Sequence, residues 1–261
     1  MDERGYPAGI ARIRDYWLGG CHHDERDRVA ADRILVCAPQ LPYLIRQVRA
    51  MQQRMVRYLI RHGVRQFLGF DSGVPTMGHV HEITQLLLTD ARVVYVDNDP
   101  LVVQTGQDLL EGNDHTAYLH ADMRCADHVL GHPDVRRLID LRKPVALMMI
   151  DTPLQVPDED DPANLITPYT DAVCPGSYLG LSQFSQTQHL LDGIAMFTRL
   201  YGNALSIPLR EPEQFACWFT GLDIVEPGIV PIPLWHPEPG EDLPANPERI
   251  RIYAGLGRKP T

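Results

Sequence analysis

The sequence predicts an α/β protein with a mostly parallel sheet that is covered by helices on both faces. Short apolar runs alternate with segments of helical periodicity from about residue 66 to residue 201. Such alternation is typical of strands that are joined by crossover helices. Several of the apolar runs stop at an aspartate, namely Asp71, Asp97, Asp122 and Asp151, which suggests that polar side chains gather at one edge of the sheet.

The first part of the chain predicts helices rather than strands. Residues 1–24 are expected to be irregular because glycine and proline recur in them. A helix is predicted over 25–38, and Pro39 and Pro42 are expected to interrupt it. A strong helix follows from Leu44 to His62, because apolar residues recur there at helical spacing. We therefore divide the chain into an N-terminal helical extension or lid, 1–63, and a sheet-containing domain, 64–261.

The alternating part of the chain predicts five parallel strands and an antiparallel edge. The tail has two extended runs that suit an antiparallel pair at the edge of the sheet, separated by a proline-rich loop at 231–247. The predicted strands are 66–70, 92–96, 116–120, 145–150 and 177–182, and the extended runs are 222–230 and 250–255. The predicted helices are approximately 79–88, 100–110, 124–140, 161–173, 187–201 and 211–220.

Composition bounds the kind of partner that the protein can have. The 261 residues suit one large domain or a domain with an extension. A formal charge of −10 argues against nucleic acid and against anionic membranes, because both need a basic face. No apolar stretch is long enough to span a bilayer, and the first residues contain no secretory signal. The expected compartment is the cytoplasm.

The cysteine pattern predicts free thiols and no metal site. The five cysteines are widely spaced, and no C-x-x-C motif occurs. Cys21 to Asp24 places four metal-ligand residue types side by side, but adjacent residues seldom reach one ion and no second cluster completes a tetrahedron.

Two aspartates at successive strand ends indicate a nucleoside site. Asp97 comes 24 residues after Gly73, the spacing at which an acidic residue accepts hydrogen bonds from ribose hydroxyls. Asp122 ends the next strand and could accept from an adenine amino group. The alternative is that each aspartate caps a turn or the following helix, as aspartate often does where a strand ends.

The chain resembles the actinobacterial S-adenosyl methyltransferase family over about residues 8–257. The resemblance implies a Rossmann-like methyltransferase fold with seven strands and an N-terminal helical segment that closes over the cofactor. It is carried by ARIRDYWLGG (11–20), AADR (30–33), VRYL (56–59), SGVPT (72–76), VHE (80–82), ARVVYVDNDP (91–100), PVALMMI (144–150), VPDEDDP (156–162), PGSYLGLS (175–182) and VEPGIVPIPLW (225–235).

The same resemblance implies S-adenosylmethionine as the cofactor. The residues that match the family at its cofactor site are Asp15, Tyr16, Ser72, Gly73, Thr76, Asp97 and Asp122. Two positions depart from the family. Gly69 replaces an acidic residue that holds the methionine amino group, and Asp71 replaces a glycine that lets the backbone approach the cofactor. These two changes make S-adenosylmethionine binding a doubtful expectation.

Further departures introduce ionisable groups. The family's Val-Leu-His type sequence after the fourth strand is Asp151-Thr152-Pro153 here, and Ser182 is followed by Gln183 rather than by histidine. We therefore take Asp71, His79 and Asp151 as candidate catalytic bases. A helix-capping Asp71 and a surface His79 are the alternatives.

Three functions are compatible with this pattern. The chain could be a working methyltransferase on a small molecule, an enzyme that performs a substitution or ring closure without the cofactor, or a non-catalytic partner subunit. Our prediction is a diverged member of the family that serves secondary-metabolite biosynthesis, with an altered cofactor loop. The predicted partners are a small-molecule substrate and either a protein partner or a second copy of the chain.

Overall fold

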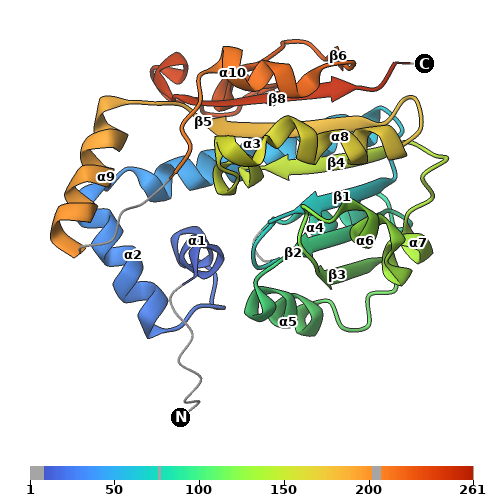
Figure 1. The fold of residues 1–261 in the computed structure, drawn as a ribbon, viewed down its shortest axis with the longest axis horizontal. Coiled ribbons are helices and arrows are strands. Elements are labelled where there is room, and N and C mark those ends of the chain that lie inside the picture. The colour runs from blue at the N-terminus through green and yellow to red at the C-terminus, as the bar shows by residue number, and fades with distance from the viewer. Residues whose placement is uncertain (1–8, 76–77, 202–206, 261) are drawn as a thin grey trace.

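The computed structural model describes residues 9–75, 78–201 and 207–260, and a mixed β-sheet runs through its centre (Figure 1). The strand order is β3-β2-β1-β4-β5-β8-β6, and β7 pairs with β8 outside this path. The first five strands of the order pair in parallel, whereas β6, β7 and β8 are antiparallel. The predicted fold class is confirmed.

The five predicted parallel strands all form, and the order turns back on itself beside β1. Because β1 lies between β2 and β4, the carboxyl ends of these strands form the edge where ligands bind in open parallel sheets. The strands are β1 (Gln66–Phe70), β2 (Arg92–Asp97), β3 (Thr116–His120), β4 (Val145–Ile150), β5 (Tyr178–Phe184), β6 (Asp223–Ile224), β7 (Val230–Pro231) and β8 (Ile252–Arg258).

The antiparallel edge forms as expected, although the run 222–230 is broken. It contributes the two-residue strand β6 and only the first residue of β7, with a turn between them. β8 lies between β5 and β6, so its seven residues are mostly buried.

The expectation of irregular structure over residues 1–24 is wrong for residues 10–18, whereas residues 1–8 lie outside the described residues. Residues 10–18 form α1 (Ile10–Leu18), which the glycines flank rather than interrupt: Gly9 precedes the helix, and Gly19 ends it with a φ of 82°. A left-handed glycine at that position is a common helix stop. The helix buries Ile13 and Trp17 in the core.

The next two helices follow the prediction closely. They are α2 (Glu25–Cys37), which Asp24 caps, and α3 (Leu41–Arg61). Pro42 does not interrupt a helix, because it stands in the first turn of α3, where its missing N–H has no intrahelical partner to lose.

The remaining helices are α4 (Val80–Leu87), α5 (Pro100–Leu109), α6 (Ala126–Gly131), α7 (Pro133–Leu138), α8 (Pro162–Ala172), α9 (Gln188–Tyr201) and α10 (Pro212–Ala216). The predicted helix 124–140 is two helices, because Pro133 forces an extended His132 and begins a new helix. The predicted helix 211–220 changes to a 3₁₀ turn at Cys217–Phe219.

Two apolar clusters cover the two faces of the sheet. One joins the N-terminal helices to the sheet through residues such as Met51, Met55 and Phe67, and the other packs α6, α7 and α8 against the opposite side chains of the strands. Figure 1 shows α1, α2 and α9 beyond the end of the sheet at which the β1 and β4 arrows point. Within the described ranges, no helix is long and apolar enough to cross a membrane.

Candidate functional site

The loop after β1 places two residues in the left-handed backbone region, and one of them is an aspartate. Asp71 has a φ of 45° and Gly73 a φ of 69°, both in the left-handed region. The Asp71 N–H donates to the Val96 carbonyl at 2.9 Å, which ties the loop to β2. Asp71 therefore holds a conformation that glycine adopts freely and that costs an L-residue about 1–2 kcal/mol.

The Asp71 carboxyl group titrates close to neutral pH. Burial is the main cause that raises its pKa to about 7, the negative charges of Asp97 and Asp122 add to the shift, and Arg124 and Arg14 oppose it. At neutral pH about half of the molecules carry a protonated Asp71. The repulsion of an anionic ligand that the sequence suggests is therefore only partial.

Gly69 and His79 both act on the shape of this loop. A Cβ added at Gly69 would lie 2.8 Å from Ser72 Oγ, so the serine side chain sits over the glycine. His79 is fully buried, with Nε2 lying 3.1 Å from the Ser72 carbonyl oxygen. Burial, followed by the charge of Arg49, lowers the pKa of His79 well below its ordinary value. A neutral His79 can donate from Nε2 to Ser72 and hold the loop.

Asp97 is buried at the end of β2, beside the loop. Its Oδ1 accepts a hydrogen bond from the Asp99 N–H at 2.9 Å. Burial is the main cause that raises its pKa, and hydrogen bonds from Asp99, Gly73 and Asn98 oppose the shift. The bond to Gly73 links the loop to β2.

Asp122 is half-buried after β3, the next strand of the sheet. Its Oδ1 accepts from the Arg124 N–H at 2.8 Å, so it does cap the turn that follows. The negative charges of Asp97 and Asp122 are both close enough to raise the pKa of Asp71, so the three acidic groups share one edge of the sheet.

Asp151 is held rigidly at the end of β4. Its Oδ2 lies 2.9 Å from Arg14 Nη2, and its Oδ1 accepts from Ser182 Oγ at 2.6 Å. The Ser182 hydroxyl also accepts from the Asp151 N–H at 2.9 Å. The Asp151 side chain is 1% exposed and that of Arg14 is 24% exposed, so the arginine covers the carboxylate.

A small charged cavity of about 40 Å³ lies between the loop, α1 and α3. Arg14, Asp15, Arg49, Asp71 and Asp151 line it together with Ser72 and Gly73. Nη1 of Arg49 is buried and makes no hydrogen bond within the described residues. Burial is the largest cause that lowers the pKa of this arginine to about 10, so it stays charged at neutral pH. A buried cation with an unsatisfied donor favours an anionic ligand group nearby.

A second and larger cavity of about 310 Å³ adjoins the first. Its lining is apolar except for Arg14 and Asp151, which also line the charged cavity. The Arg14–Asp151 ion pair, together with Ile45, therefore forms the wall that the two cavities share.

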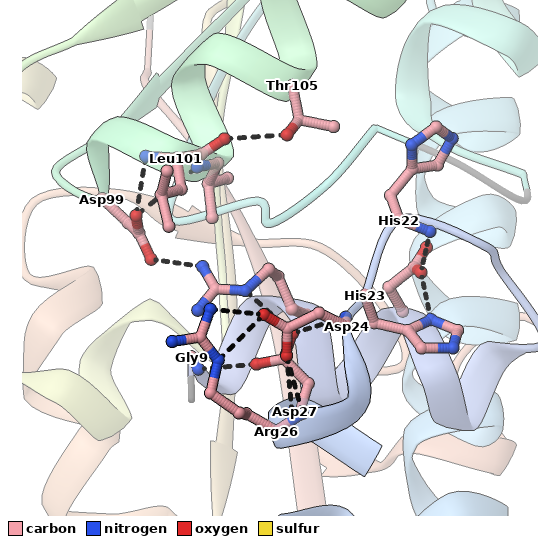
Figure 2. A network of polar contacts seen from close by, with 12 residues as sticks. Gly9, His22, His23, Asp24, Arg26, Asp27, Asp99, Leu101 and Thr105 are labelled. Atoms are coloured by element: carbon pink, nitrogen blue, oxygen red, sulfur yellow. Dashed lines mark hydrogen bonds and ion pairs between the residues drawn. The ribbon is translucent and has the colours of Figure 1, made fainter. Parts of the chain in front are cut away.

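The N-terminal segment is fastened over the site by buried polar contacts (Figure 2). Arg12 on α1 pairs with the fully buried Asp27 on α2 at 3.0 Å and reaches Asp99 at 3.4 Å. Asp99 caps α5 by accepting from the Leu101 N–H. Arg12 thus connects the N-terminal helices to the turn that follows Asp97.

The predicted Asp15 and Tyr16 shape this segment from within. Asp15 Oδ2 accepts from the His22 N–H at 2.8 Å and lies 3.0 Å from His23 Nδ1. The Tyr16 ring contacts the His23 ring edge-on at 5.0 Å. A Cβ on Gly20 would lie only 1.9 Å from Asp15 Oδ1, so this turn requires glycine.

The structure brings some of the predicted site residues into one cavity and leaves others outside it. Asp15, Asp71, Ser72, Gly73 and Asp151 line the charged cavity, with Asp97 and Asp122 at the neighbouring strand ends. His79 lines neither cavity and lies beneath the loop, so the surface alternative for it is wrong. Thr76 lies outside the described residues. The roles assigned to these residues stay predictions.

Sequence reasoning missed Arg14 and Arg49. Arg14 lies inside the stretch 11–20 that matches the family, so its position could have marked it as a site residue. Arg49 lies in an ordinary helical pattern, and nothing in the sequence distinguishes it from a surface arginine. In the part of the chain that the structure describes, no three His, Cys, Asp or Glu side chains are grouped so that they could hold a metal ion.

The family model described as S-adenosyl methyltransferase matches residues 5–260. The chain belongs to the S-adenosyl methyltransferase family. A candidate methyltransferase from Thermobifida fusca is 36% identical, with a TM-score of 0.88 over 98% of this chain and 96% of that one. A DUF574 family protein from Streptomyces avermitilis is also 36% identical, with a TM-score of 0.88 over 97% and 98% of the two chains. No curated protein matches the sequence.

A more distant structure supports the fold alone. The N-methyltransferase NodS from Bradyrhizobium japonicum, in complex with S-adenosyl-l-homocysteine, is 12% identical, with a TM-score of 0.50 over 96% of this chain and all of that one.

The side chains of this S-adenosyl methyltransferase family member fit S-adenosylmethionine in charge and in position. Asp97 and Asp122 stand at the strand ends where a nucleoside binds, and the left-handed Gly73 permits close approach of the backbone. Arg14, Arg49, Asp15 and Asp71 offer both signs of charge to an amino-acid group. The space is tight, since about 40 Å³ is far below the roughly 300 Å³ of an ordinary ligand site.

Proposed function

We propose that the protein is a diverged S-adenosylmethionine-dependent methyltransferase that acts on a small molecule. The carrying observation is that one ion pair, Arg14–Asp151, lines both a charged cavity at the cofactor loop and an apolar cavity beside it. Two adjoining cavities of opposite character suit two substrates that must meet. Secondary-metabolite biosynthesis stays a prediction for the pathway in which the enzyme works.

The chain's own residues would serve this reaction mainly by placing the reactants. Asp97 and Asp122 would bind the nucleoside half, and Arg49, whose buried Nη1 makes no hydrogen bond within the described residues, would pair with the carboxylate of the methionine half. When bound, S-adenosylmethionine supplies an electrophilic methyl group, which bonds to the acceptor while the carbon–sulfur bond breaks, the sulfur keeps the electron pair and the acceptor loses a proton. Asp151 is the nearest candidate to receive that proton.

Entry of the cofactor requires α1 to move. Ala11 of α1 packs against the loop, since a Cβ added at Gly73 would lie 3.5 Å from the Ala11 Cβ. The small charged cavity is thus the closed form of the site, and α1 acts as its lid.

The decisive experiment is calorimetric titration with S-adenosylhomocysteine at pH 6 and pH 8. We expect micromolar binding that weakens as the pH rises through about 7, because a ligand that excludes water from Asp71 favours its protonated form. The Asp71→Gly variant should bind more tightly and lose this pH dependence, whereas the exposed control Asp90→Gly should behave as wild type.

A second candidate rests on the pKa of Asp71. A carboxyl group with a pKa of about 7 is well matched to general-base catalysis at neutral pH, as a substitution or ring closure without the cofactor would need. Absence of binding by wild type with restored binding by Asp71→Gly would favour this candidate. Absence of binding by both proteins would contradict the proposed methyl transfer and favour this candidate or a non-catalytic partner subunit.

A further inference from the structure

The apolar cavity beside the charged one has a lining that selects its ligand. We propose that it binds a small, largely apolar molecule that carries one neutral hydroxyl group, and that this molecule is the acceptor. The name acceptor rests on the proposed methyl transfer, whereas the binding site does not.

The walls of the apolar cavity come from five separate elements and from the turn after β4. α1, α2, α3, β5 and α9 contribute apolar side chains, and Arg14 and Asp151 are the only charged residues among those that line it in the described ranges. Representative wall residues are Ile34, Leu41, Ile45, Phe184, Leu190 and Ile194.

The size and polarity of the apolar cavity narrow the ligand class. Its volume of about 310 Å³ lies at the lower end of the roughly 300–1,000 Å³ that small-molecule sites occupy. A polyphosphate, a sugar or a peptide would lose hydrogen bonds to water without replacement, which costs several kcal/mol per group. A cavity lined by aliphatic and aromatic carbon instead favours an aromatic or aliphatic body.

The Arg14–Asp151 pair defines the polar end of the ligand. An anionic group would meet a guanidinium that Asp151 already neutralises, and an ammonium would meet a carboxylate that Arg14 already covers. A hydroxyl group both donates and accepts, so it can bond to either member of the pair without adding a charge. The guanidinium has five N–H donors, and its 24% exposure leaves it the accessible member.

The orientation of the ligand follows from the shared wall. Because Arg14 and Asp151 also line the charged cavity, a hydroxyl bound to them lies where the two cavities meet. The apolar body then extends away from the cofactor loop toward α2 and α9.

The test is calorimetric titration of the full-length protein, without cofactor, with naphthalene, 2-naphthol and 2-naphthoate. We expect 2-naphthol to bind about tenfold more tightly than 2-naphthoate. Ile194→Trp on α9 should fill the apolar cavity and weaken 2-naphthol at least about tenfold. Leu200→Trp, at an exposed position of the same helix outside the cavity, should change it less than about twofold.

The polar end is tested by Arg14→Met and Arg14→Lys. Arg14→Met should bind naphthalene as wild type does and lose the preference for 2-naphthol over naphthalene, whereas Arg14→Lys should keep it. Absence of binding for all three compounds, or equal binding by Ile194→Trp, would overturn the cavity as a ligand site. Tightest binding of 2-naphthoate would overturn the neutral hydroxyl.

These outcomes are separable from the fate of the proposed function. Titration of Ile194→Trp with S-adenosylhomocysteine should match wild type, because Ile194 lies outside the charged cavity. A protein that binds 2-naphthol in the apolar cavity and ignores S-adenosylhomocysteine would keep the ligand site and reject methyl transfer.

Discussion

At the scale of single residues, Asp71 is unfavourable for folding in two ways, which the remaining contacts of the fold must offset. Its backbone is in the left-handed region, and its carboxyl group is buried near Asp97 and Asp122. The Val96 carbonyl holds its N–H, and the adjoining strands fix the turn. Residues that keep such costs are often found at functional sites.

The first prediction concerns the charge of Asp71. In the unfolded chain an aspartate titrates near pH 4, whereas in the folded chain Asp71 titrates near pH 7. Between these values only the folded chain holds the proton, so its stability falls as the pH rises from about 4 to about 7 and is then constant. Asp71→Asn keeps a residue that tolerates the left-handed region, and it should be more stable than wild type by an amount that grows over this range. Thermal unfolding at pH 5 and pH 8 measures the difference. The exposed control Asp90→Asn should differ from wild type in stability by the same amount at pH 5 and at pH 8. The same stability difference at both pH values for Asp71→Asn would contradict the assigned pKa.

The second prediction concerns the lowered pKa of the buried His79. Its folded-state pKa is depressed, so below about pH 6.5 only the unfolded chain takes up a proton. Stability therefore falls as the pH drops through 6.5. His79→Gln retains a side-chain donor for the Ser72 carbonyl and removes the titrating group. Its free energy of unfolding should therefore fall less than that of wild type when the pH drops from 7.5 to 5.5. Urea unfolding at pH 7.5 and pH 5.5 measures the two slopes. The exposed control His115→Gln should retain the wild-type loss.

Sequence reasoning reached part of the site for physical reasons. Asp97 ends β2 and Asp122 comes shortly after β3, so the sheet itself brings them to one edge. Arg49 lies within α3, where nothing in the pattern shows that its Nη1 is buried without a partner. The pKa of Asp71 also depends on distances between three strand ends, which only the folded chain fixes.

At the scale of elements, α1 is fastened by Arg12. This side chain pairs with Asp27, whose carboxylate is fully buried and also accepts from the Gly9 N–H. Its second contact, to Asp99, is longer and half-exposed on the aspartate side. The contact to Asp99 is therefore the weaker part, and it can open when α1 moves.

The third prediction separates these parts. Arg12→Met should leave Asp27 buried without its cation, which costs about 3–5 kcal/mol, and should raise hydrogen exchange in α1 and α2. Asp99→Asn should raise exchange in α1 by a smaller amount and leave β1 unchanged. Hydrogen–deuterium exchange with mass spectrometry resolves these segments. Arg28→Met is the matched control, because the Arg28–Glu25 pair is exposed and worth at most about 1 kcal/mol. Unchanged exchange in α1 for Arg12→Met would reject the fastening role.

Proline and glycine explain the errors at the element scale. Pro42 stands inside the first turn of α3, and Pro133 begins a helix, so the same residue type marks a start in both cases rather than a stop. The glycines near α1 lie just outside its ends. Periodicity fixed the long elements, whereas the short ones depend on where a breaker falls within a turn.

At the scale of the whole molecule, the predicted division into 1–63 and 64–261 stays a prediction about folding units. α3 belongs to the first segment, yet its side chains share one apolar cluster with the strands. Arg54 of α3 is 3% exposed and donates to the Ile232 and Trp235 carbonyls at 2.6 and 2.9 Å. It also pairs with Glu241, so the N-terminal segment is bonded to the proline-rich loop.

The last prediction follows from this long-range bonding. Arg54→Met removes a buried cation from the partly exposed Glu241 and leaves the Ile232 and Trp235 carbonyls without their donor, so it should lower the free energy of unfolding by about 3–5 kcal/mol. Because α3 and the sheet share one apolar cluster, residues 1–63 and 64–261 should still unfold in a single transition, and this transition should shift to lower temperature or denaturant concentration. Intrinsic tryptophan fluorescence, with Trp17 in one segment and Trp218 in the other, and far-ultraviolet circular dichroism should give coincident transitions. Arg61→Met on the same helix is the control, since the Arg61–Glu238 pair is exposed and should change stability by less than about 1 kcal/mol. Separate transitions in Arg54→Met would mean that residues 1–63 fold as their own unit, and that α1 can open without strain on the sheet.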